Sequence, residues 1–340
     1  MGETNTPGLD LRRLREYLDA ERPGLVRGEL TGELITGGRS NLTYAVTDGQ
    51  QRWAVRRPPL GHVLPTAHDM GREYRVISAL GSTAVPVPPT VLYCDDPGPI
   101  GARFYVMEFV DGTAYRDAAR LSVIGARRTS DVVAAMVDTL VDLHAVDPAS
   151  VGLGDFGRPD GFLERQVRRW GKQLDASRSR ELPGIDELKD RLAATMPTSP
   201  EPTVVHGDYR LDNVLVDEND RITAVLDWEM STLGDPLTDL ALIIAYNGGG
   251  VPAMSTRSNV HEAPGFPTID EIVERYGKRS GRDLSTLPWY VGFAYFKIAV
   301  ILEGIHYRYS QGQTVGDDFD RIGEAVPSLI SAGLSQLDAD

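Results

Sequence analysis

The spacing of apolar residues near the N-terminus predicts a helix followed by three strands. Across 10–20 the apolar residues recur at helical intervals and would form one hydrophobic face, made of Leu11, Leu14, Tyr17 and Leu18. From 29 to 57 the pattern changes to short β-prone runs, ELITG, NLTYAVTD and RWAVRRP, which are separated by glycine-containing turn signals. These runs predict an antiparallel meander of three strands.

A second helix and two further strands follow. The helical stripe of 67–80 gives way to VPVPPT, which cannot continue a helix because proline lacks the N–H group that a helix needs. VLYC and RFYVMEFV are typical of strands, and Asp111-Gly112 is a turn signal that marks a domain boundary. We therefore expect an N-terminal domain, 1–110, made of a small antiparallel sheet with a helix.

The remaining residues, 111–340, are expected to form a larger, mainly helical domain, which makes the chain an α+β protein. Helical periodicity is present over 129–146 and 161–174. The apolar stretch 289–309 falls short of the about 20 uninterrupted apolar residues of a membrane span, so it predicts a buried helix. It is interrupted by Lys297, Glu303, His306 and Arg308. One stretch, TVVHGDYRLDNVLVDENDRITAVLDWE, instead alternates short β runs around a turn.

Composition and charge narrow the classes of function. Hydrophobic residues make up 41% of the 340 residues and charged residues 25%, which is ordinary for soluble globular proteins and excludes coiled-coil and collagen-like chains. The net charge of −14 opposes binding to nucleic-acid phosphates. The single cysteine, Cys94, allows no intrachain disulfide, and the N-terminus resembles no secretory signal. We expect a cytoplasmic protein without nucleic-acid or membrane partners.

The chemistry is clearest around His206-Gly207-Asp208. Asn213 follows Asp208 by five residues, and a predicted hairpin would bring Asp227 back to the level of Asn213. An amide oxygen and a carboxylate are ligands that suit Mg²⁺. Asp208, on its own loop, could accept the proton of an attacking hydroxyl group. The alternative is that the three residues are ordinary capping and surface groups.

The motif His-Gly-Asp-x4-Asn, followed by Leu-Asp-Trp at the end of a hairpin, resembles the phosphotransferase family of aminoglycoside kinases and choline kinases, distant relatives of protein kinases. The resemblance implies a protein-kinase-like fold of two lobes, with nucleotide binding in 1–110 and catalysis and acceptor binding in 111–340. It implies that Asp208 is the catalytic base and that Asn213 and Asp227 bind Mg²⁺. Arg210 matches the position of a cation on the transferred phosphate, and His206 would pack beneath the catalytic loop.

The same resemblance suggests how ATP is held. Gly37-Gly38-Arg39-Ser40-Asn41 lies between two predicted strands, as a phosphate-covering loop would, although it departs from G-x-G-x-x-G and could be a plain hairpin turn. Arg56 takes the place of the phosphate-binding lysine, with Arg57 as the alternative one residue on, and Glu73 would pair with it. The strand FYVMEFVDG resembles the linker that holds adenine by main-chain groups. The cofactor-binding residues implied are Gly38, Arg39, Ser40, Asn41, Arg56, Glu73, Glu108 and Val110.

Two acidic residues after the hairpin have structural roles in this reading. In Gly234-Asp235-Pro236, the aspartate is expected to cap a helix. Asp239 matches a family acid that braces the catalytic loop, with an exposed position as the alternative.

Longer motifs, among them Gly-Gly-Arg-Ser-Asn-Leu-Thr-Tyr and Leu-Asp-Trp-Glu-Met-Ser-Thr-Leu-Gly-Asp-Pro, most resemble kinase-like domains found alone in bacteria or ahead of some acyl-CoA dehydrogenases. We expect an ATP- and Mg²⁺-dependent kinase that acts on a small-molecule hydroxyl group. The alternative is an ATP-binding pseudokinase or regulatory domain, and a metal-dependent hydrolase lacks clustered ligands.

The acceptor could be aminoglycoside-like or of a hydroxyacyl type, and two features bear on the choice. The loop 247–268 could cover an acceptor or be a plain surface loop. A basic patch could bind a phosphorylated or CoA-linked acceptor or be a solvated helix face; it consists of Arg165, Arg168, Arg169 and Lys172. Nucleotide preference and oligomeric state do not follow from the sequence.

Overall fold

The computed structural model describes residues 6–35, 41–61, 68–248, 259–312 and 321–338. Two compact units are present. The first, here called the sheet unit, comprises Met1–Gly112 and Thr223–Ser231, and the second, the helical unit, comprises Thr113–Ile222 and Thr232–Asp340. This division describes how the chain packs and does not assign a function to either unit. The assignment of 1–110 to nucleotide binding and of 111–340 to catalysis stays a prediction.

The sheet unit contains a five-stranded antiparallel sheet in the order β1-β2-β3-β5-β4. Its strands are β1 (Thr31–Leu34), β2 (Leu42–Thr47), β3 (Arg52–Arg57), β4 (Thr90–Cys94) and β5 (Phe104–Glu108). The meander and the two later strands are therefore confirmed. The first strand was expected to cover ELITG, but the described strand begins two residues earlier, because Thr31 and Gly32 still pair with β2. Residues 36 and 37 lie outside the described part.

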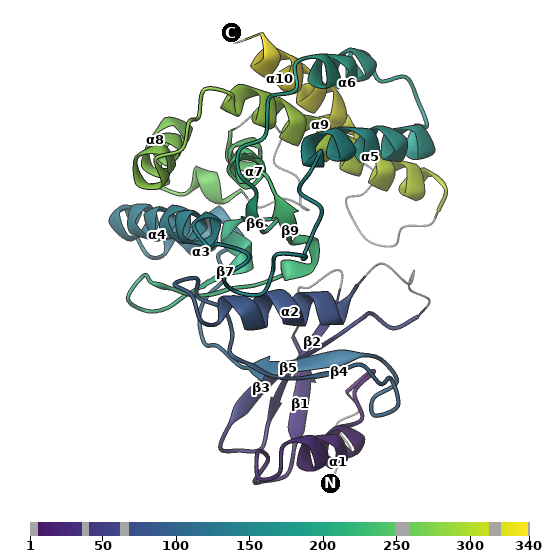
Figure 1. Ribbon diagram of the computed structural model, residues 1–340, viewed down its shortest axis with the longest axis vertical. Coiled ribbons are helices and arrows are strands. Elements are labelled where there is room, and N and C mark those ends of the chain that lie inside the picture. The colour runs from purple at the N-terminus through teal and green to yellow at the C-terminus, as the bar shows by residue number, and fades with distance from the viewer. Residues whose placement is uncertain (1–5, 36–40, 62–67, 249–258, 313–320, 339–340) are drawn as a thin grey trace. The chain divides into compact units, whose positions relative to one another are not determined.

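Helices α1 (Leu11–Glu21) and α2 (Met70–Leu80) lie on opposite sides of this sheet (Figure 1). Asp10 caps α1, and its carboxylate accepts hydrogen bonds from the N–H groups of Arg12 and Arg13. The apolar face of α1 packs with alternate residues of β2, β3, β4 and β5, because successive side chains of a strand point to opposite faces. Complete burial of a leucine such as Leu18 stabilises this core by about 2 kcal/mol.

The opposite face of the sheet carries the polar side chains of β3 toward α2. α2 contacts β4 and β5, and it also packs against the 3₁₀ helix η2 (Trp228–Met230). Segment 223–231 thereby belongs to the sheet unit: the Val225 N–H donates to the Pro86 carbonyl (2.8 Å), and Arg72 donates to the Ser231 carbonyl (3.1 Å). The division between the units falls within β8 (Ile222–Val225).

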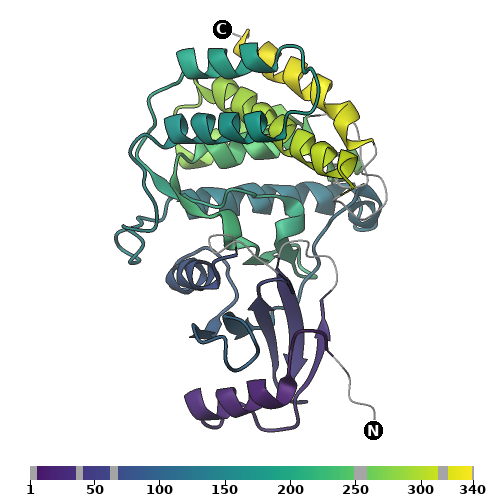
Figure 2. The same ribbon diagram turned by 90° about the vertical axis from the view of Figure 1, so that its right-hand side faces the viewer.

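The helical unit is built around α9 (Leu287–Ser310), which contacts α5, α6, α7 and α10. Figure 2 shows α10, in yellow, lying along α9, with α5, in teal, also against it. The described helices of the unit are α3 (Ala118–Ser122), α4 (Ala126–His144), α5 (Phe162–Ser177), α6 (Ile185–Ala194), α7 (Leu237–Asn247), α8 (Ile269–Ser280), α9 and α10 (Val326–Leu337), with the 3₁₀ turns η1 (Leu211–Asn213), η3 (Val260–Glu262) and η4 (Ile322–Ala325).

α9 is the buried helix predicted from 289–309. By length and composition it could cross a membrane, but 78% of its most apolar window is buried inside the structure. The core helix of a soluble protein passes the same test, so this composition is weak evidence for a span.

Three short strands of the helical unit position the candidate catalytic loop. β6 (Thr203–Val205) pairs antiparallel with β9 (Thr232–Gly234), and β7 (Val214–Val216) forms a bridge to Thr113. The turn after β7 is closed by the N–H of Asp217 donating to the Arg221 carbonyl (3.0 Å). This is the turn that the sequence predicts at 217–220. The carboxylate of Asp217 also accepts the N–H groups of Asn219 (2.8 Å) and Arg221 (3.0 Å), and such local bonds explain why the β run stops there.

Candidate active site

The His206-Gly207-Asp208 loop follows β6 directly. Gly207 has φ +85°, a left-handed conformation that residues with a Cβ rarely adopt, so the loop requires glycine between His206 and Asp208. η1 then turns the chain back. The amide nitrogen of Asn213 donates to the main-chain carbonyl of Asp208 (2.8 Å) and to its carboxylate Oδ2 (3.1 Å). The structure thus brings the predicted base and the predicted metal ligand Asn213 together.

Asp239, on α7, braces the His206-Gly207-Asp208 loop through hydrogen bonds. Its carboxylate is fully buried and accepts the N–H groups of His206 (2.7 Å) and Gly207 (2.8 Å). Burial alone would raise the pKa of Asp239, but His144 and the main-chain donors hold it below its ordinary value. The bracing role expected for Asp239 is confirmed, and the alternative of an exposed carboxylate is wrong. His206 is fully buried and packs against the ring of Tyr209, as expected.

His144 extends this buried network to α8. Its Nε2 lies 3.3 Å from Oδ2 of Asp239, and its Nδ1 lies 2.8 Å from the hydroxyl of Tyr276. Burial lowers the pKa of His144 below its ordinary value, so the ring is neutral at pH 7. Because a carboxylate only accepts hydrogen bonds, the ring proton belongs on Nε2, and Nδ1 accepts the Tyr276 hydroxyl.

Arg210 lies beside the candidate base. Its Nη2 pairs with the carboxylate of Asp212 (2.8 Å), and its Nε lies 3.5 Å from Oδ2 of Asp208. The guanidinium also lies 5.3 Å from the centre of the Tyr246 ring. Asp212 therefore holds Arg210 close to Asp208, where a cation could meet a phosphate. Its predicted catalytic role stays a prediction.

Lys297 is a residue of this site that the sequence analysis treated only as an interruption of an apolar helix. Its ammonium group donates to the carbonyl of Gly207 (3.1 Å) and lies 5.7 Å from the centre of the Trp170 ring. Desolvation lowers the pKa of Lys297, and the charges of Asp208 and Asp239 oppose that effect. A lone lysine inside a buried helix is costly unless something compensates its charge, and this was the signal that could have found it.

In the sheet unit, Arg56 and Glu73 form the ion pair that the sequence predicts. Nε of Arg56 donates to Oε2 of Glu73 (2.8 Å), and both side chains are almost fully buried. Burial opposes the charge of Arg56, but Glu73 and other acidic groups raise its pKa above the ordinary value. Arg57 points elsewhere and bonds to the carbonyls of Gly8 and Ile100, which resolves the one-residue ambiguity in favour of Arg56.

Asp227 is the second partner of Arg56. Its Oδ1 accepts a hydrogen bond from Nη2 of Arg56 (2.5 Å). Asp227 also has φ +66°, in the left-handed region that residues other than glycine seldom adopt. This left-handed backbone conformation costs about 1 kcal/mol of free energy. The fold accepts this cost and holds the carboxylate of Asp227 against Arg56.

Asn41 and Tyr105 complete the surroundings of Glu73. The amide nitrogen of Asn41 donates to Glu73 (2.9 Å) and to Glu229 (3.1 Å), and the Tyr105 hydroxyl donates to Glu73 (3.0 Å). The side chain of Asn41 thus braces the ion pair, and its role in phosphate binding stays a prediction. Tyr105 was not singled out from the sequence, because a tyrosine in a strand gives no sign that its hydroxyl will meet Glu73 on α2.

Burial of Glu73 should make stability depend on pH. Burial raises the pKa of Glu73 to about 7 from 4.5, against the effect of Arg56. Between these values the folded state binds a proton that the unfolded state has released, so stability should fall as pH rises from about 4.5 to 7, by about 3 kcal/mol. Urea denaturation across this range should show the decline in the parent protein and a flatter profile in Glu73→Gln. Equal slopes would contradict the assignment.

Glu108 and Val110, the expected adenine-binding positions, lie at and just after the end of β5. The N–H of Glu108 donates to the carbonyl of Pro89 (2.8 Å). Residues paired in this way in an antiparallel ladder normally exchange two hydrogen bonds, but Pro89 has no N–H to return. The carbonyl of Glu108 therefore lacks that bond and remains able to accept one from a ligand. The sequence analysis chose Glu108 and Val110 from the resemblance of FYVMEFVDG to a linker and did not use Pro89, and adenine binding stays a prediction.

Three of the predicted cofactor-binding residues, Gly38, Arg39 and Ser40, lie outside the described residues, as does 249–258 of the loop 247–268. Asp235 caps the start of α7 through its side chain, as expected, although the described helix begins at Leu237 with Pro236 as the residue before it. Its buried carboxylate accepts the Leu237 N–H (3.1 Å) and the Tyr290 hydroxyl (2.6 Å), so it ties the start of α7 to α9.

The two predicted metal ligands belong to different units, and each is described within its own. Asn213 uses its amide nitrogen toward Asp208, which leaves its amide oxygen for a metal. Asp227 engages Arg56 through Oδ1, which leaves Oδ2. These are hard oxygen donors that fit Mg²⁺. Across the described ranges no group of three His, Cys, Asp or Glu side chains could hold a metal ion, so a hydrolase site of that kind is not found there.

The sheet unit has an antiparallel sheet and a helix that are joined by the buried ion pair of Arg56 and Glu73. The helical unit carries a loop in which Asn213 follows Asp208 by five residues. These features define a kinase-like phosphotransferase. Similar solved structures agree. A protein of Ralstonia eutropha JMP134, provisionally described as an aminoglycoside phosphotransferase, is 31% identical with a TM-score of 0.84, covering 97% of this chain and 98% of that one. Aminoglycoside phosphotransferase APH(4)-Ia, crystallised with AMP-PNP and hygromycin B, is 16% identical (TM-score 0.60; 94% and 98% covered) and shows the fold alone.

The model of the phosphotransferase enzyme family matches residues 31–272, and the chain belongs to this family. The resemblance inferred from the motifs and the kinase-like α+β fold are therefore confirmed. Acyl-CoA dehydrogenase family member 11 of Rattus norvegicus is 36% identical in an alignment of 334 positions that covers 96% of this chain. The match covers 43% of that relative's own length, so the chain spans less than half of it.

Proposed function

We propose that the protein is an ATP- and Mg²⁺-dependent kinase that transfers the γ-phosphate to a hydroxyl group of a small molecule. The observation that carries the proposal is the held geometry of Asp208. Asp239 accepts the main-chain N–H groups of the two residues before Asp208, and Asn213 donates to the carboxylate of Asp208 itself, so the loop is fixed. A base needs this fixed orientation to accept a proton from a hydroxyl group in reach of a phosphate.

The proposed reaction balances without further reactants. The acceptor oxygen forms a bond to the γ-phosphorus, the bond from that phosphorus to the bridging oxygen breaks, and ADP leaves. The hydroxyl proton moves to the carboxylate of Asp208, and Arg210 stabilises the transferred phosphoryl group. Bound Mg²⁺ would supply neutralisation of phosphate charge, with Asn213 and Asp227 as its ligands.

Nucleotide binding is proposed for the sheet unit, with Arg56 on a phosphate and the carbonyl of Glu108 on adenine. Support comes from relatives of the same fold crystallised with ADP, GDP or AMP-PNP. The competing proposal is an ATP-binding pseudokinase or regulatory domain, in which these residues bind nucleotide without transfer. A non-catalytic binder has no physical need for a braced Asp208, which favours the kinase. A cytoplasmic location and the absence of nucleic-acid and membrane partners stay predictions.

A pooled acceptor screen tests the proposal. Protein, ATP and Mg²⁺ are incubated with aminoglycosides, amino alcohols, sugars and hydroxyacyl compounds, and phosphorylated products are detected by mass spectrometry. A kinase should add one phosphoryl group to at least one acceptor. Thermal stabilisation by nucleotide with no product from any class would instead support the pseudokinase.

Replacement of Arg56 tests the nucleotide site. Arg56→Met removes a charge-assisted contact worth about 1.5–3 kcal/mol, so the KM for ATP should rise about tenfold to a hundredfold. Arg56→Lys should retain part of the affinity, because lysine keeps the charge but cannot bond to two carboxylates through a rigid fork. Steady-state kinetics with varied ATP measure the effect. An unchanged KM in Arg56→Met would remove Arg56 from the phosphate site.

A further inference from the structure

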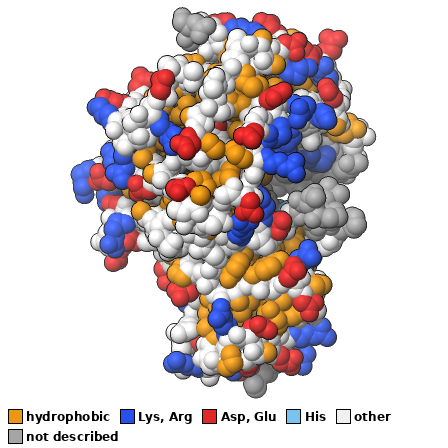
Figure 3. All heavy atoms as spheres, viewed as in Figure 1, with side chains coloured by type: hydrophobic (Ala, Val, Ile, Leu, Met, Phe, Trp, Pro, Cys, Tyr) orange, Lys and Arg blue, Asp and Glu red, His pale blue; other side chains and the backbone are white. Residues whose placement is uncertain are grey.

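Helix α5 presents a basic face to solvent. Arg165, Arg168, Arg169 and Lys172 recur at the intervals that place side chains on one side of a helix. Together with Gln166 and Gln173 they line a surface cavity of about 470 Å³. The opposite side of α5, including Val167, Trp170 and Leu174, is buried against the unit. Figure 3 shows blue side chains gathered over the region of α5.

Most of these cations have no acidic partner within the described ranges. Arg165 donates to the carbonyls of Asp160 and Arg158. No ion pair joins Arg168, Arg169 or Lys172 to a carboxylate among the residues that the structure describes. Like charges at these helical intervals repel each other, and each such pair costs a few tenths of a kcal/mol. In a chain with net charge −14, a cationic cluster left without local anions is unusual.

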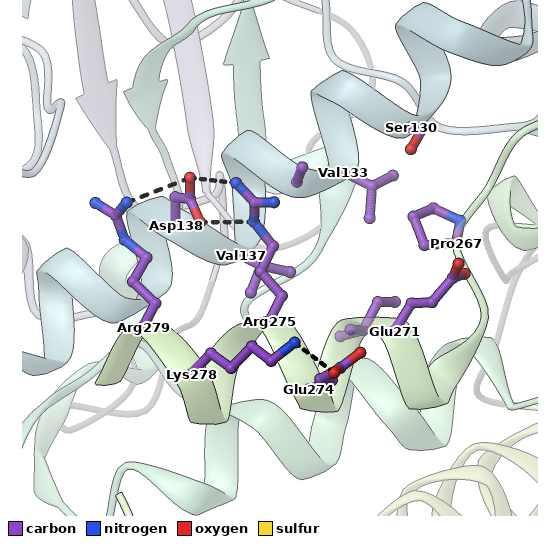
Figure 4. A pocket seen from close by; sticks show the side chains of 12 residues that line it. Ser130, Val133, Val137, Asp138, Pro267, Glu271, Glu274, Arg275, Lys278 and Arg279 are labelled. Carbon is purple, nitrogen blue, oxygen red and sulfur yellow. Dashed lines mark hydrogen bonds and ion pairs between the residues drawn. The ribbon is translucent and has the colours of Figure 1, made fainter. Parts of the chain in front are cut away.

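Helix α8 shows the opposite arrangement and serves as an internal comparison. Arg275 and Arg279 both bond to the carboxylate of Asp138 on α4, and Lys278 pairs with Glu274 (Figure 4). These three cations also line a surface groove, of about 520 Å³, but each is neutralised by a carboxylate. The cations of α5 are therefore not typical of helix surfaces in this protein, and their charge remains available to an external anion.

The basic face adjoins the candidate active site within the same unit. The guanidinium of Arg169 and the ammonium of Lys297 lie 5.8 and 5.7 Å from the ring centre of Trp170. Lys297 in turn donates to the carbonyl of Gly207, the residue before Asp208. The indole N–H of Trp170 is buried and has no hydrogen-bond acceptor among the described residues. Cationic groups and an unused donor thus continue from α5 toward the candidate base.

We propose that the basic face of α5 is a binding site for an organic phosphate, and that the acceptor is a hydroxyl compound carrying such a group. The second part rests on the proposed kinase function. Arg168, Arg169 and Lys172 bind the phosphate, because guanidinium and ammonium groups form strong charge-assisted hydrogen bonds to phosphate oxygens. Lys297 and Trp170 lie between this site and Asp208, which receives the hydroxyl group. The site selects against cationic acceptors such as aminoglycosides.

Calorimetric binding of pyrophosphate tests the site independently of catalysis. Arg168→Gln, Arg169→Gln and Lys172→Gln combined should weaken binding at least about tenfold, since several charge-assisted contacts are lost. The matched control combines Arg275→Gln, Lys278→Gln and Arg279→Gln, which removes the same charge from α8 and should leave the affinity within about twofold. Circular dichroism checks that both variants fold. Equal weakening in the two variants would overturn the site.

The same titration is repeated with saturating AMP-PNP and Mg²⁺, because pyrophosphate could also enter the nucleotide site. Binding that persists supports the α5 site, and binding that AMP-PNP abolishes contradicts it.

Matched acceptors with and without a phosphate test the second part of the proposal, that the acceptor carries a phosphate. The pairs are glycerol with glycerol 3-phosphate and ribose with ribose 5-phosphate. The α5 variant should lose about tenfold or more in kcat/KM for the phosphorylated member only. A preference of the parent protein for unphosphorylated acceptors would overturn this part. Absence of transfer to every acceptor would count against the kinase function, and calorimetry alone would then decide the α5 site.

Discussion

Asp208→Asn is expected to lower phosphoryl transfer about a hundredfold to ten-thousandfold, the range that loss of a general base produces. The side chain keeps its size, and its oxygen can still accept the amide hydrogen of Asn213, so the loop should keep its shape. Only the ability to take the acceptor's proton is lost. The fall should therefore appear in kcat, with the KM for ATP little changed.

The measurement is steady-state phosphorylation with an acceptor found in the pooled screen, with nucleotide binding followed by thermal shift. Asp217→Asn is the control. Asp217 lies in the turn after β7, where its carboxylate accepts the N–H groups of Asn219 and Arg221, so its neutralisation should leave transfer intact. Full activity in Asp208→Asn would exclude Asp208 as the base, and loss of nucleotide stabilisation would point to misfolding instead.

Asp239→Ala is expected to lower the free energy of unfolding by about 3–5 kcal/mol. The substitution leaves the buried N–H groups of His206 and Gly207 and the ring of His144 without their acceptor. Urea denaturation measures the loss. Asp239→Asn keeps one oxygen acceptor and should lose less, and Asp270→Ala, at an exposed position in the first turn of α8, should lose under about 1 kcal/mol.

The stabilisation by Asp239 should also depend on acidity. Because its pKa in the folded protein lies below the ordinary value, the stabilisation is present at neutral pH and is lost as pH falls through the folded-state pKa. The parent protein should therefore lose more stability on acidification than Asp239→Ala does. Parallel acid profiles for the two proteins would show that the carboxylate of Asp239 carries no such linkage.

Local patterns in the sequence predicted most elements of the fold. The stripe of α1, the meander of β1 to β3 and the apolar length of α9 depend on periodicity, which neighbouring residues determine. The pairing of β6 with β9 and the position of β5 between β3 and β4 were not predicted, because they depend on contacts between distant segments. The second partner of Asp235 was not predicted for the same reason. The local motif indicates the cap, but it does not show that the hydroxyl of Tyr290 in α9 also donates to the carboxylate.

The candidate site divides in the same way. Fixed spacing and residue type indicate the chemistry of four site residues, and for this reason the sequence predicted Asp208, Asn213, Arg56 and Glu73. Lys297 and Tyr105 were not, since their roles arise only from packing against Gly207 and Glu73. The unpaired state of the α5 cations could not be inferred either, because a sequence does not show which carboxylates lie within reach.

The packing of 223–231 against α2 has a consequence for any attempt to divide the protein. A gene fragment that stops at residue 112 encodes all five strands of the large sheet but omits Asp227, one of the two carboxylates that hold Arg56. The chain leaves this unit, builds the Asp208 loop, returns for nine residues and leaves again. Swapping either unit between homologues therefore means exchanging two separate pieces of sequence. A single crossover after residue 112 would combine Arg56 from one homologue with Asp227 from the other.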